Sequence, residues 1–191
     1  MNLDLEPVPS CDTVSEEPAR AIQEERKGCE LVDGIWVEKA TCNPAAIVEG
    51  SILSSIQGFV QSRKLGHVLG ADGAYRMLPD RPKLLRKPDV SFVAAGRLSP
   101  EELKKAEWAI APDLAVEGIS PNESAEDLET KLDEYLRAGV RLVWLVYIPT
   151  RNVWAYRPDG TAKRYRADDT LTGEDVLPGF AVKVSELFEG L

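Results

Sequence analysis

Apolar residues recur every three to four positions along residues 124–139, which is the spacing of an amphipathic helix. At about 100° per residue, one face of this helix carries four apolar side chains: Leu128, Leu132, Tyr135 and Leu136. Lys131 falls on the same side, between Leu128 and Tyr135. A lysine there either extends its ammonium group to solvent or meets an anion. Both alternatives stay open at this point, a packed stem at the edge of the face or an ion pair.

Two apolar runs on either side of this helix have the character of buried strands. A period of two along residues 113–119 puts four side chains on one face: Asp113, Ala115, Glu117 and Ile119. Residues 141–148 form the second run, and such a strand–helix–strand unit predicts a right-handed crossover between parallel strands. We therefore expect Lys131 to turn towards the strand that carries Glu117.

The remaining pattern predicts one domain of mixed structure over residues 18–191. A hairpin is predicted over residues 30–38 with Asp33-Gly34 as its turn, helices over 18–27, 45–64 and 185–189, and strands over 88–93 and 153–156. Residues 66–73 and 168–180 are predicted as turns and loops, and residues 1–17 as a disordered acidic segment. These elements predict a central mixed β-sheet flanked by helices, at the border of the α/β and α+β classes.

The helix over residues 45–64 carries an acidic side chain on its apolar stripe. Leu53, Ile56 and Val60 form the stripe, and Glu49 extends it by one turn towards the N-terminus. A glutamate there is either a first-turn residue that interacts with the helix dipole or a member of a functional site.

Composition restricts the possible kinds of site. The three cysteines have no CxxC spacing and His67 is the only histidine, so a cysteine or histidine zinc site is excluded. We expect His67 to be a loop residue without a catalytic role. The sequence has no signal-peptide pattern and no apolar run long enough to cross a membrane, so we expect a soluble protein of the cytoplasm.

Charge is unevenly distributed along the chain. The net charge of −9 argues against a protein that coats nucleic acid in bulk. Residues 63–87, however, hold seven basic residues against two acidic ones, a net charge of +5 that leaves −14 for the remainder. This basic strip is either an ordinary charged loop or a surface that faces phosphate groups.

Acidic residues in or beside the predicted strands are candidate partners for Lys131, namely Asp89, Asp113 and Glu117. Carboxylates without nearby histidine or cysteine are hard ligands that suit Mg²⁺ or Mn²⁺. A divalent ion held by Asp89 and Glu117 would activate water and polarise a phosphate group. Lys131 beside it would orient the water and offset the charge that develops on phosphorus.

Several stretches of the chain resemble the Uma-two family, in the PD-(D/E)xK superfamily of restriction-endonuclease-like nucleases. The matching stretches are Glu30-Leu-Val-Asp-Gly34, Leu65-Gly-His-Val-Leu-Gly70, Pro88-Asp-Val-Ser-Phe-Val93, Ala111-Pro-Asp-Leu-Ala-Val-Glu117, residues 131–146, Asp169-Thr-Leu171 and Leu177-Pro-Gly-Phe180. Together they lie along most of residues 28–189, and the block over residues 112–146 is the most specific.

The resemblance implies a restriction-endonuclease-like core and four site residues. Asp89 matches the first catalytic aspartate and Glu117 the second acidic residue, both as metal ligands. The usual lysine would lie at Ile119, and Lys131 replaces it from the following helix. Glu49 matches an acidic residue on the first helix that can hold metal through water. At Gly118, where the family more often has valine, a glycine is expected to loosen the strand.

These resemblances imply a Mg²⁺-dependent (or Mn²⁺-dependent) DNA endonuclease that hydrolyses phosphodiester bonds. The alternative is a non-catalytic protein on a degenerate nuclease fold that binds nucleic acid or another partner. Three aromatic residues, Trp144, Trp154 and Tyr156, fall in two predicted strands near an expected sheet edge. An exposed edge of this kind predicts a homodimer.

Overall fold

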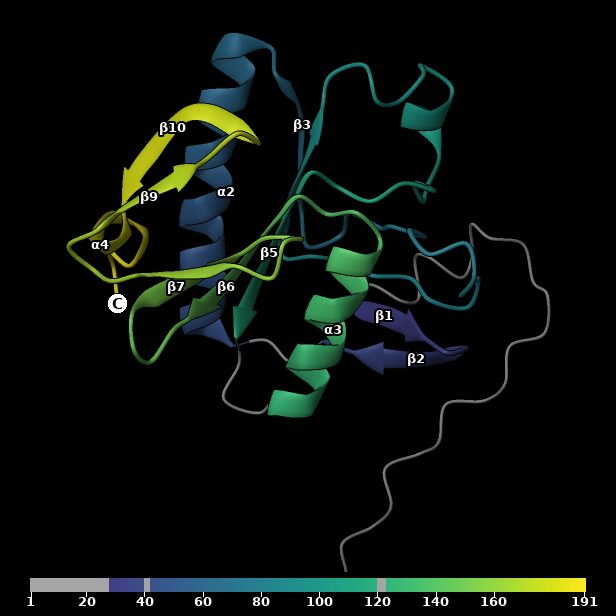
Figure 1. The fold of residues 1–191 in the computed structure, drawn as a ribbon, viewed down its shortest axis with the longest axis horizontal. Helices are drawn as coiled ribbons and strands as arrows, with labels where there is room; N and C mark the ends of the chain where they lie inside the picture. The colour runs from purple at the N-terminus through teal and green to yellow at the C-terminus, as the bar shows by residue number, and fades with distance from the viewer. Residues whose placement is uncertain (1–27, 40–41, 120–122) are drawn as a thin grey trace, which may run out of the picture.

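The computed structural model of the protein describes residues 28–39, 42–119 and 123–191. The predicted disorder over residues 1–17 and the predicted helix over residues 18–27 lie outside the described residues. Within them, a six-stranded sheet has the strand order β3-β4-β5-β6-β7-β8 (Figure 1). The strands are β3 (Gly66–Gly70), β4 (Val90–Ala94), β5 (Leu114–Ile119), β6 (Leu142–Tyr147), β7 (Asn152–Tyr156) and β8 (Ala162–Tyr165).

The sheet is mixed, as expected. Strands β5 and β6 run parallel, with Glu117 opposite Leu145, whereas the other neighbouring pairs of this sheet are antiparallel. Helix α3 (Ala125–Arg137) connects the two parallel strands. Its N-terminus is capped by Ser124, whose Oγ accepts a hydrogen bond of 3.0 Å from the backbone N–H of Asp127. Gly139, at φ 92°, follows its C-terminus.

Helices cover both faces of the sheet (Figure 1). One face of the sheet shares a core with helix α2 (Asn43–Arg63), with the short helix α4 (Val184–Leu187) and with a hairpin of β9 (Thr170–Gly173) and β10 (Leu177–Lys183). Helix α3 packs on the opposite face. Strand β6 is apolar on both sides because it lies between these layers: Trp144 joins the α2 core and Val143 the α3 core. Full burial of such a side chain contributes about 1.5–3 kcal/mol.

The buried face of α2 differs from the predicted stripe in the first half of the helix, where the buried positions lie one residue earlier. It consists of Ala45, Val48, Ile52, Ile56 and Val60. Leu53 is only partly buried at the flank of this face, and Glu49 lies on the same flank one turn earlier. Because α2 begins at Asn43, Glu49 lies beyond its first turn, and the helix-dipole explanation for this glutamate is wrong.

The predicted hairpin is confirmed as β1 (Cys29–Val32) and β2 (Ile35–Glu38). Its turn residues, Asp33 and Gly34, both have positive φ, 51° and 87°, as a two-residue turn that matches the twist of the strands requires. Leu31 exchanges two backbone hydrogen bonds with Leu85, of 3.1 and 2.8 Å, so the hairpin is docked on the segment that leads into β4.

Two predicted loop regions form strands instead. Residues 66–70 are edge strand β3, which carries His67, so His67 is not a loop residue. A side chain at Gly66 would place its Cβ 2.1 Å from the carbonyl oxygen of Val93, so glycine permits this close pairing with β4. Residues 170–173 and 177–183 form the β9–β10 hairpin rather than a loop.

The expected sheet edge is also displaced. Strand β8, which the pattern did not predict, pairs with β7 and forms the edge on that side. Trp154 and Tyr156 therefore lie in the second strand from the edge, and Trp144 is fully buried. The exposed Lys163 and Arg164 of β8 are side chains of the kind that discourage edge pairing. None of the described helices is long and apolar enough to cross a membrane.

Candidate active site

Two buried carboxylates lie side by side on neighbouring strands. Asp89 immediately precedes β4, and Glu117 lies in β5. The backbone N–H of Asp89 donates to the carbonyl of Val116 at 3.0 Å, and Oδ2 of Asp89 accepts from the N–H of Gly118 at 2.8 Å. The strand pairing itself therefore brings Asp89 to Glu117, as the sequence predicted.

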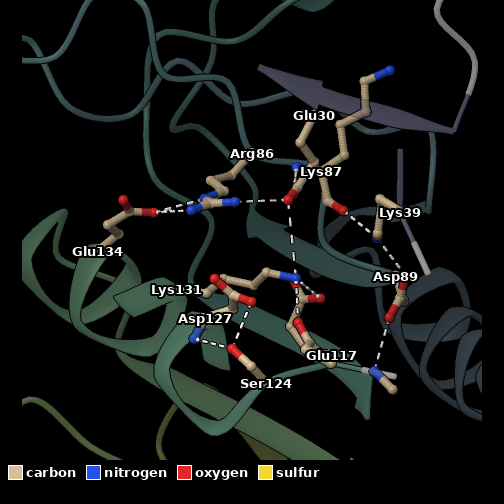
Figure 2. A network of polar contacts seen from close by, with 12 residues as sticks. Glu30, Lys39, Arg86, Lys87, Asp89, Glu117, Ser124, Asp127, Lys131 and Glu134 are labelled. Atoms are coloured by element: carbon tan, nitrogen blue, oxygen red, sulfur yellow. Dashed lines mark hydrogen bonds and ion pairs between the residues drawn. The ribbon is translucent and has the colours of Figure 1, made fainter. Parts of the chain in front are cut away.

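Lys131 meets an anion rather than extending to solvent. Its Nζ lies 3.2 Å from Oε2 of Glu117 and 3.9 Å from Oε2 of Glu30 (Figure 2). It also lies 3.0 Å from Oε1 of Glu123. Only 11 % of its side chain is exposed. Helix α3 thus places a lysine beside Glu117, whereas β5 has Ile119 two positions after this glutamate. Asp113, the third candidate, does not join this group, because it precedes the opposite end of β5 and accepts a hydrogen bond from Arg97 at 2.8 Å there.

Tyr135 belongs both to the core and to the site. It follows Lys131 by one turn of α3 and is fully buried. Its hydroxyl donates a hydrogen bond of 2.5 Å to Oε1 of Glu117. The two oxygens of Glu117 are therefore held by different partners, Tyr135 on one and Lys131 on the other.

Lys39 is a second lysine at the site, and the sequence analysis missed it. Its Nζ lies 2.5 Å from Oδ1 of Asp89 and 2.6 Å from the carbonyl oxygen of Lys87 (Figure 2). Lys39 directly follows β2, so the hairpin brings it over the start of β4. A single charged residue at the end of a short strand has no periodicity that could have indicated this role.

Glu49 approaches the same cluster from α2, and Gly118 makes room for it. An ideal Cβ at position 118 would lie 2.3 Å from Oε1 of Glu49. Gly118 itself keeps a regular place in β5, opposite Val146 of β6, and its N–H binds Asp89. Gly118 therefore keeps the register of β5 and also leaves room for a third carboxylate beside Asp89.

Burial and neighbouring charges shift the pKa values of the carboxylates in this cluster in different directions. Burial would raise the pKa of Glu117, but Lys131, Lys39 and the hydroxyl of Tyr135 outweigh it and lower the pKa. Burial and the nearby charge of Glu117 raise the pKa of Asp89 against the opposing effect of Lys39.

The pKa of Glu49 is raised to about 7 by burial and by Asp89, with a smaller contribution from Glu117. Burial would lower the pKa of Lys131, but Glu117, Glu30 and Glu123 raise it, so Lys131 stays protonated.

A buried arginine connects the hairpin to the helix that carries Lys131. Arg86 donates from Nε to Oε2 of Glu134 at 2.6 Å and from Nη1 to Oε2 of Glu30 at 2.8 Å (Figure 2). Oε1 of Glu30 also accepts from the backbone N–H of Lys87 at 2.7 Å. Glu134 lies one turn after Lys131 on α3, so this network fixes the helix against β1. Neither Glu30 nor Glu134 was predicted from the sequence as a site residue.

The basic strip over residues 63–87 is not a uniform surface for phosphate. Arg86 is buried, Arg76 pairs with Glu107 at 2.7 Å, and Arg81 pairs with both Asp33 and Glu134. Three of its seven basic residues are therefore neutralised by carboxylates of the protein itself. Lys83, beside the hairpin turn, is exposed.

The cluster opens into a cleft of about 320 Å³. Its charged lining comes from the hairpin, from the segment before β4, from β5 and from the region of α3, and comprises Glu30, Glu38, Lys39, Arg86, Asp89, Glu117, Glu123, Asp127 and Lys131. A larger hollow of about 540 Å³ beside β3 has only Asp72 and Lys105 as charged lining residues. The cleft with the acid–lysine cluster is therefore the candidate active site.

The donor set of this cleft fits a hard cation. Asp89 and Glu117 offer oxygen ligands, which Mg²⁺ and Mn²⁺ prefer. The bound ammonium group of Lys39 shows that Asp89 takes a positive partner. Among the described residues, however, no three or more side chains of His, Cys, Asp or Glu are already arranged around a metal position. The carboxylates are held by lysines instead.

Comparison with known proteins agrees with this fold. The mixed sheet, with helices on both faces, defines an α/β protein with a restriction-endonuclease-like core. A crystal structure of a "putative nuclease belonging to DUF820" from Anabaena variabilis ATCC 29413 superposes with a TM-score of 0.72 at 19 % identity, over 84 % of this chain and 89 % of that chain.

The family is identified by sequence. A model of the Uma2 family, described as "Putative restriction endonuclease", matches residues 16–185, and the chain belongs to this family. No curated protein matches the chain. The predicted resemblance and fold class are thus confirmed, and family membership supports a nuclease function.

Proposed function

We propose that this protein is a divalent-metal-dependent DNA endonuclease that hydrolyses phosphodiester bonds. The observation that carries the proposal is the 3.2 Å contact of Lys131 with Glu117, beside Asp89 in an open cleft. Buried lysine–carboxylate pairs can be purely structural, but this one lines a cleft and continues into further carboxylates. An ion pair with a purely structural role would not need to line an open cleft.

Asp89 and Glu117 would hold Mg²⁺ or Mn²⁺ through their carboxylate oxygens. When bound, such an ion lowers the pKa of a coordinated water and polarises the phosphate group. Lys131, kept protonated by its acidic neighbours, cannot serve as a proton acceptor. It would donate hydrogen bonds and positive charge to the attacking water or the phosphate. Glu49 would be auxiliary, behind Asp89 on the α2 side.

The substrate would reach the cleft past the hairpin. Lys83 is exposed beside Gly34 at the hairpin turn, where its carbonyl oxygen accepts a hydrogen bond of 3.1 Å from the N–H of that glycine. A lysine in this place is suited to a backbone phosphate of DNA. The net acidity of the rest of the chain limits non-specific binding away from this face.

The test is cleavage of plasmid, linear duplex and single-stranded DNA with Mg²⁺, Mn²⁺ or EDTA. Native protein is compared with Lys131→Ala and with Lys104→Ala, an exposed lysine far from the cleft. We expect metal-dependent cleavage by the native protein and by Lys104→Ala, and at least a hundredfold loss in Lys131→Ala. Equal cleavage by all three proteins would mean that the site is elsewhere or that a contaminant cuts the DNA.

A non-catalytic nucleic-acid-binding protein is the second candidate. The observation that favours it is Lys39 on Asp89, together with the lack, in the described part of the chain, of a ready group of metal ligands. Binding of DNA that persists in EDTA, with no cleavage of any substrate, would support this candidate. A homodimer stays a prediction, and sedimentation analysis of the native protein would test it.

A further inference from the structure

Two lysines face the carboxylates of the cleft, and they are held very differently. Lys131 contacts three carboxylates, and its helix is fixed by the buried pair of Arg86 and Glu134. Lys39 contacts one carboxylate, Asp89, and one carbonyl oxygen, that of Lys87. It lies just beyond the last residue of β2 rather than inside a helix or strand.

The cluster holds more negative than positive charge. Asp89, Glu117 and Glu49 converge from three elements, and mutual repulsion of such groups has to be offset when they are buried. Lys39 lies against Asp89, which Lys131 does not contact, and only 12 % of the Lys39 side chain is exposed. Its ammonium group therefore supplies the cation that Asp89 needs while no other cation is bound.

A divalent ion at Asp89 would meet the charge of Lys39. Oδ2 of Asp89 accepts the backbone N–H of Gly118 at 2.8 Å and faces the strand, whereas Oδ1 faces Lys39 at 2.5 Å, so a metal ion that uses Oδ1 takes the place of the ammonium group. Two cations cannot share that oxygen closely, because like charges a few ångströms apart repel strongly where water is scarce.

We propose that Lys39 is an exchangeable counter-ion, which holds the carboxylates together in the metal-free protein and leaves Asp89 when a divalent cation binds there. This inference rests on the proposed function, which makes Asp89 a metal ligand. Lys39 thereby weakens metal binding and keeps the cleft assembled without metal. Lys131 stays on Glu117 in both states.

The first experiment measures binding of Mn²⁺ by calorimetry, without DNA, to native protein and four variants. Lys39→Met removes the competing charge while keeping the length of the side chain, and we expect about tenfold tighter binding or more. Lys39→Arg keeps the charge and should bind Mn²⁺ no more tightly than native protein. Lys104→Met makes the same change in net charge at an exposed site away from the cleft and should leave the affinity within about twofold.

The fourth variant, Asp89→Asn, separates this inference from the proposed function. If Asp89→Asn binds Mn²⁺ as native protein does, Asp89 is no ligand, and the proposed metal site fails together with the role of Lys39. If Asp89→Asn loses binding while Lys39→Met keeps native or weaker affinity, the metal site stands and the exchange is overturned. Binding by Lys39→Met where native protein shows none would support the exchange most strongly.

A second experiment uses native protein alone, in case Lys39→Met does not fold. Lysines are labelled with an acylating reagent with and without Mn²⁺, and the extent of modification at Lys39 and Lys83 is read by peptide mass spectrometry. We expect Mn²⁺ to increase labelling of Lys39 severalfold and to leave Lys83 unchanged. Unchanged or reduced labelling of Lys39, at Mn²⁺ concentrations that calorimetry shows to be saturating, would overturn the exchange.

Discussion

The carboxylate of Glu49 occupies the space that a side chain at Gly118 would need. The 2.3 Å separation between Oε1 of Glu49 and an ideal Cβ at position 118 is shorter than any ordinary contact. Helix α2 and strand β5 therefore approach each other closely at this point, and the small residue belongs to the strand. The acidic side chain at position 49 can reach this place only because position 118 has no side chain.

Gly118→Ala is expected to displace Glu49 without unfolding the protein. The obstructing atom is the end of a flexible side chain, so the carboxylate can swing away, and the stability should change by less than about 1 kcal/mol. Metal affinity and cleavage should fall as far in Gly118→Ala as in Glu49→Ala, and the double variant should be no worse than either. Additive losses would show that the two positions act independently.

Lys131 and Glu117 are expected to be strongly coupled in stability. Lys131→Met leaves Glu117 buried with one partner fewer, which should cost about 3 kcal/mol in urea unfolding. Glu117→Gln removes the charge that Lys131 neutralises. The double variant should be less destabilised than the sum of the single variants, by at least about 1 kcal/mol. A sum that is simply additive would mean that the two side chains do not interact in solution.

Arg86→Met is expected to be among the most destabilising single changes. It leaves two buried carboxylates, Glu30 and Glu134, without the shared guanidinium group, at a cost of about 3–5 kcal/mol. Arg76→Met is the matched control, because its pair with Glu107 is about one-third exposed and should contribute at most about 1 kcal/mol. Similar midpoints of thermal unfolding for the two variants would contradict this view of the network.

Glu49 is expected to make stability depend on pH near neutrality. Its pKa is about 7 in the folded protein against 4.5 ordinarily, so the folded state holds a proton that the unfolded state loses between these values. The stability attributable to Glu49 therefore falls as pH rises from 4.5 through 7. Glu49→Gln should match native protein near pH 4.5 and exceed it above pH 7, by about 1–2 kcal/mol after discounting for solvent screening.

The measurement is thermal unfolding in EDTA across this pH range. Glu129→Gln, on the exposed side of α3, serves as the control for the loss of one carboxylate at the surface. A stability difference for Glu49→Gln that does not change between pH 4.5 and pH 7 would show that the carboxylate is not buried against Asp89 in solution.

The elements between β5 and β6 were predictable because their patterns are long and regular. Strand β5, helix α3 and strand β6 each bury a continuous or strictly periodic set of apolar residues, so tertiary packing agrees with local pattern. Strands β3 and β8 were missed because edge strands are short and need little burial. Gly66 and Gly70 bound β3, and three of the four residues of β8 are exposed, which is typical of loops in sequence.

The site was predictable where strand or helix periodicity placed a charged residue on an apolar face. Glu117 and Lys131 follow that rule, Asp89 stands beside an apolar run, and the structure brings the three together. Lys39 does not, since its position depends on how the hairpin docks through Leu31 and Leu85. The effect of Gly118 also depends on contacts between α2 and β5, which no local pattern encodes.

The distances in sequence between the partners of the cleft bear on the order of folding. Lys39 and Asp89 are 50 positions apart, Arg86 and Glu134 are 48 apart, and Glu30 and Lys87 are 57 apart. Contacts of such high sequence separation form late, because closing long loops costs entropy before any contact repays it. A nascent chain in which α3 has not yet been synthesised carries Glu30 and Asp89 but neither Lys131 nor Glu134. Completion of the cleft therefore waits until α3 has been synthesised and can pack against the strands and the hairpin that precede it.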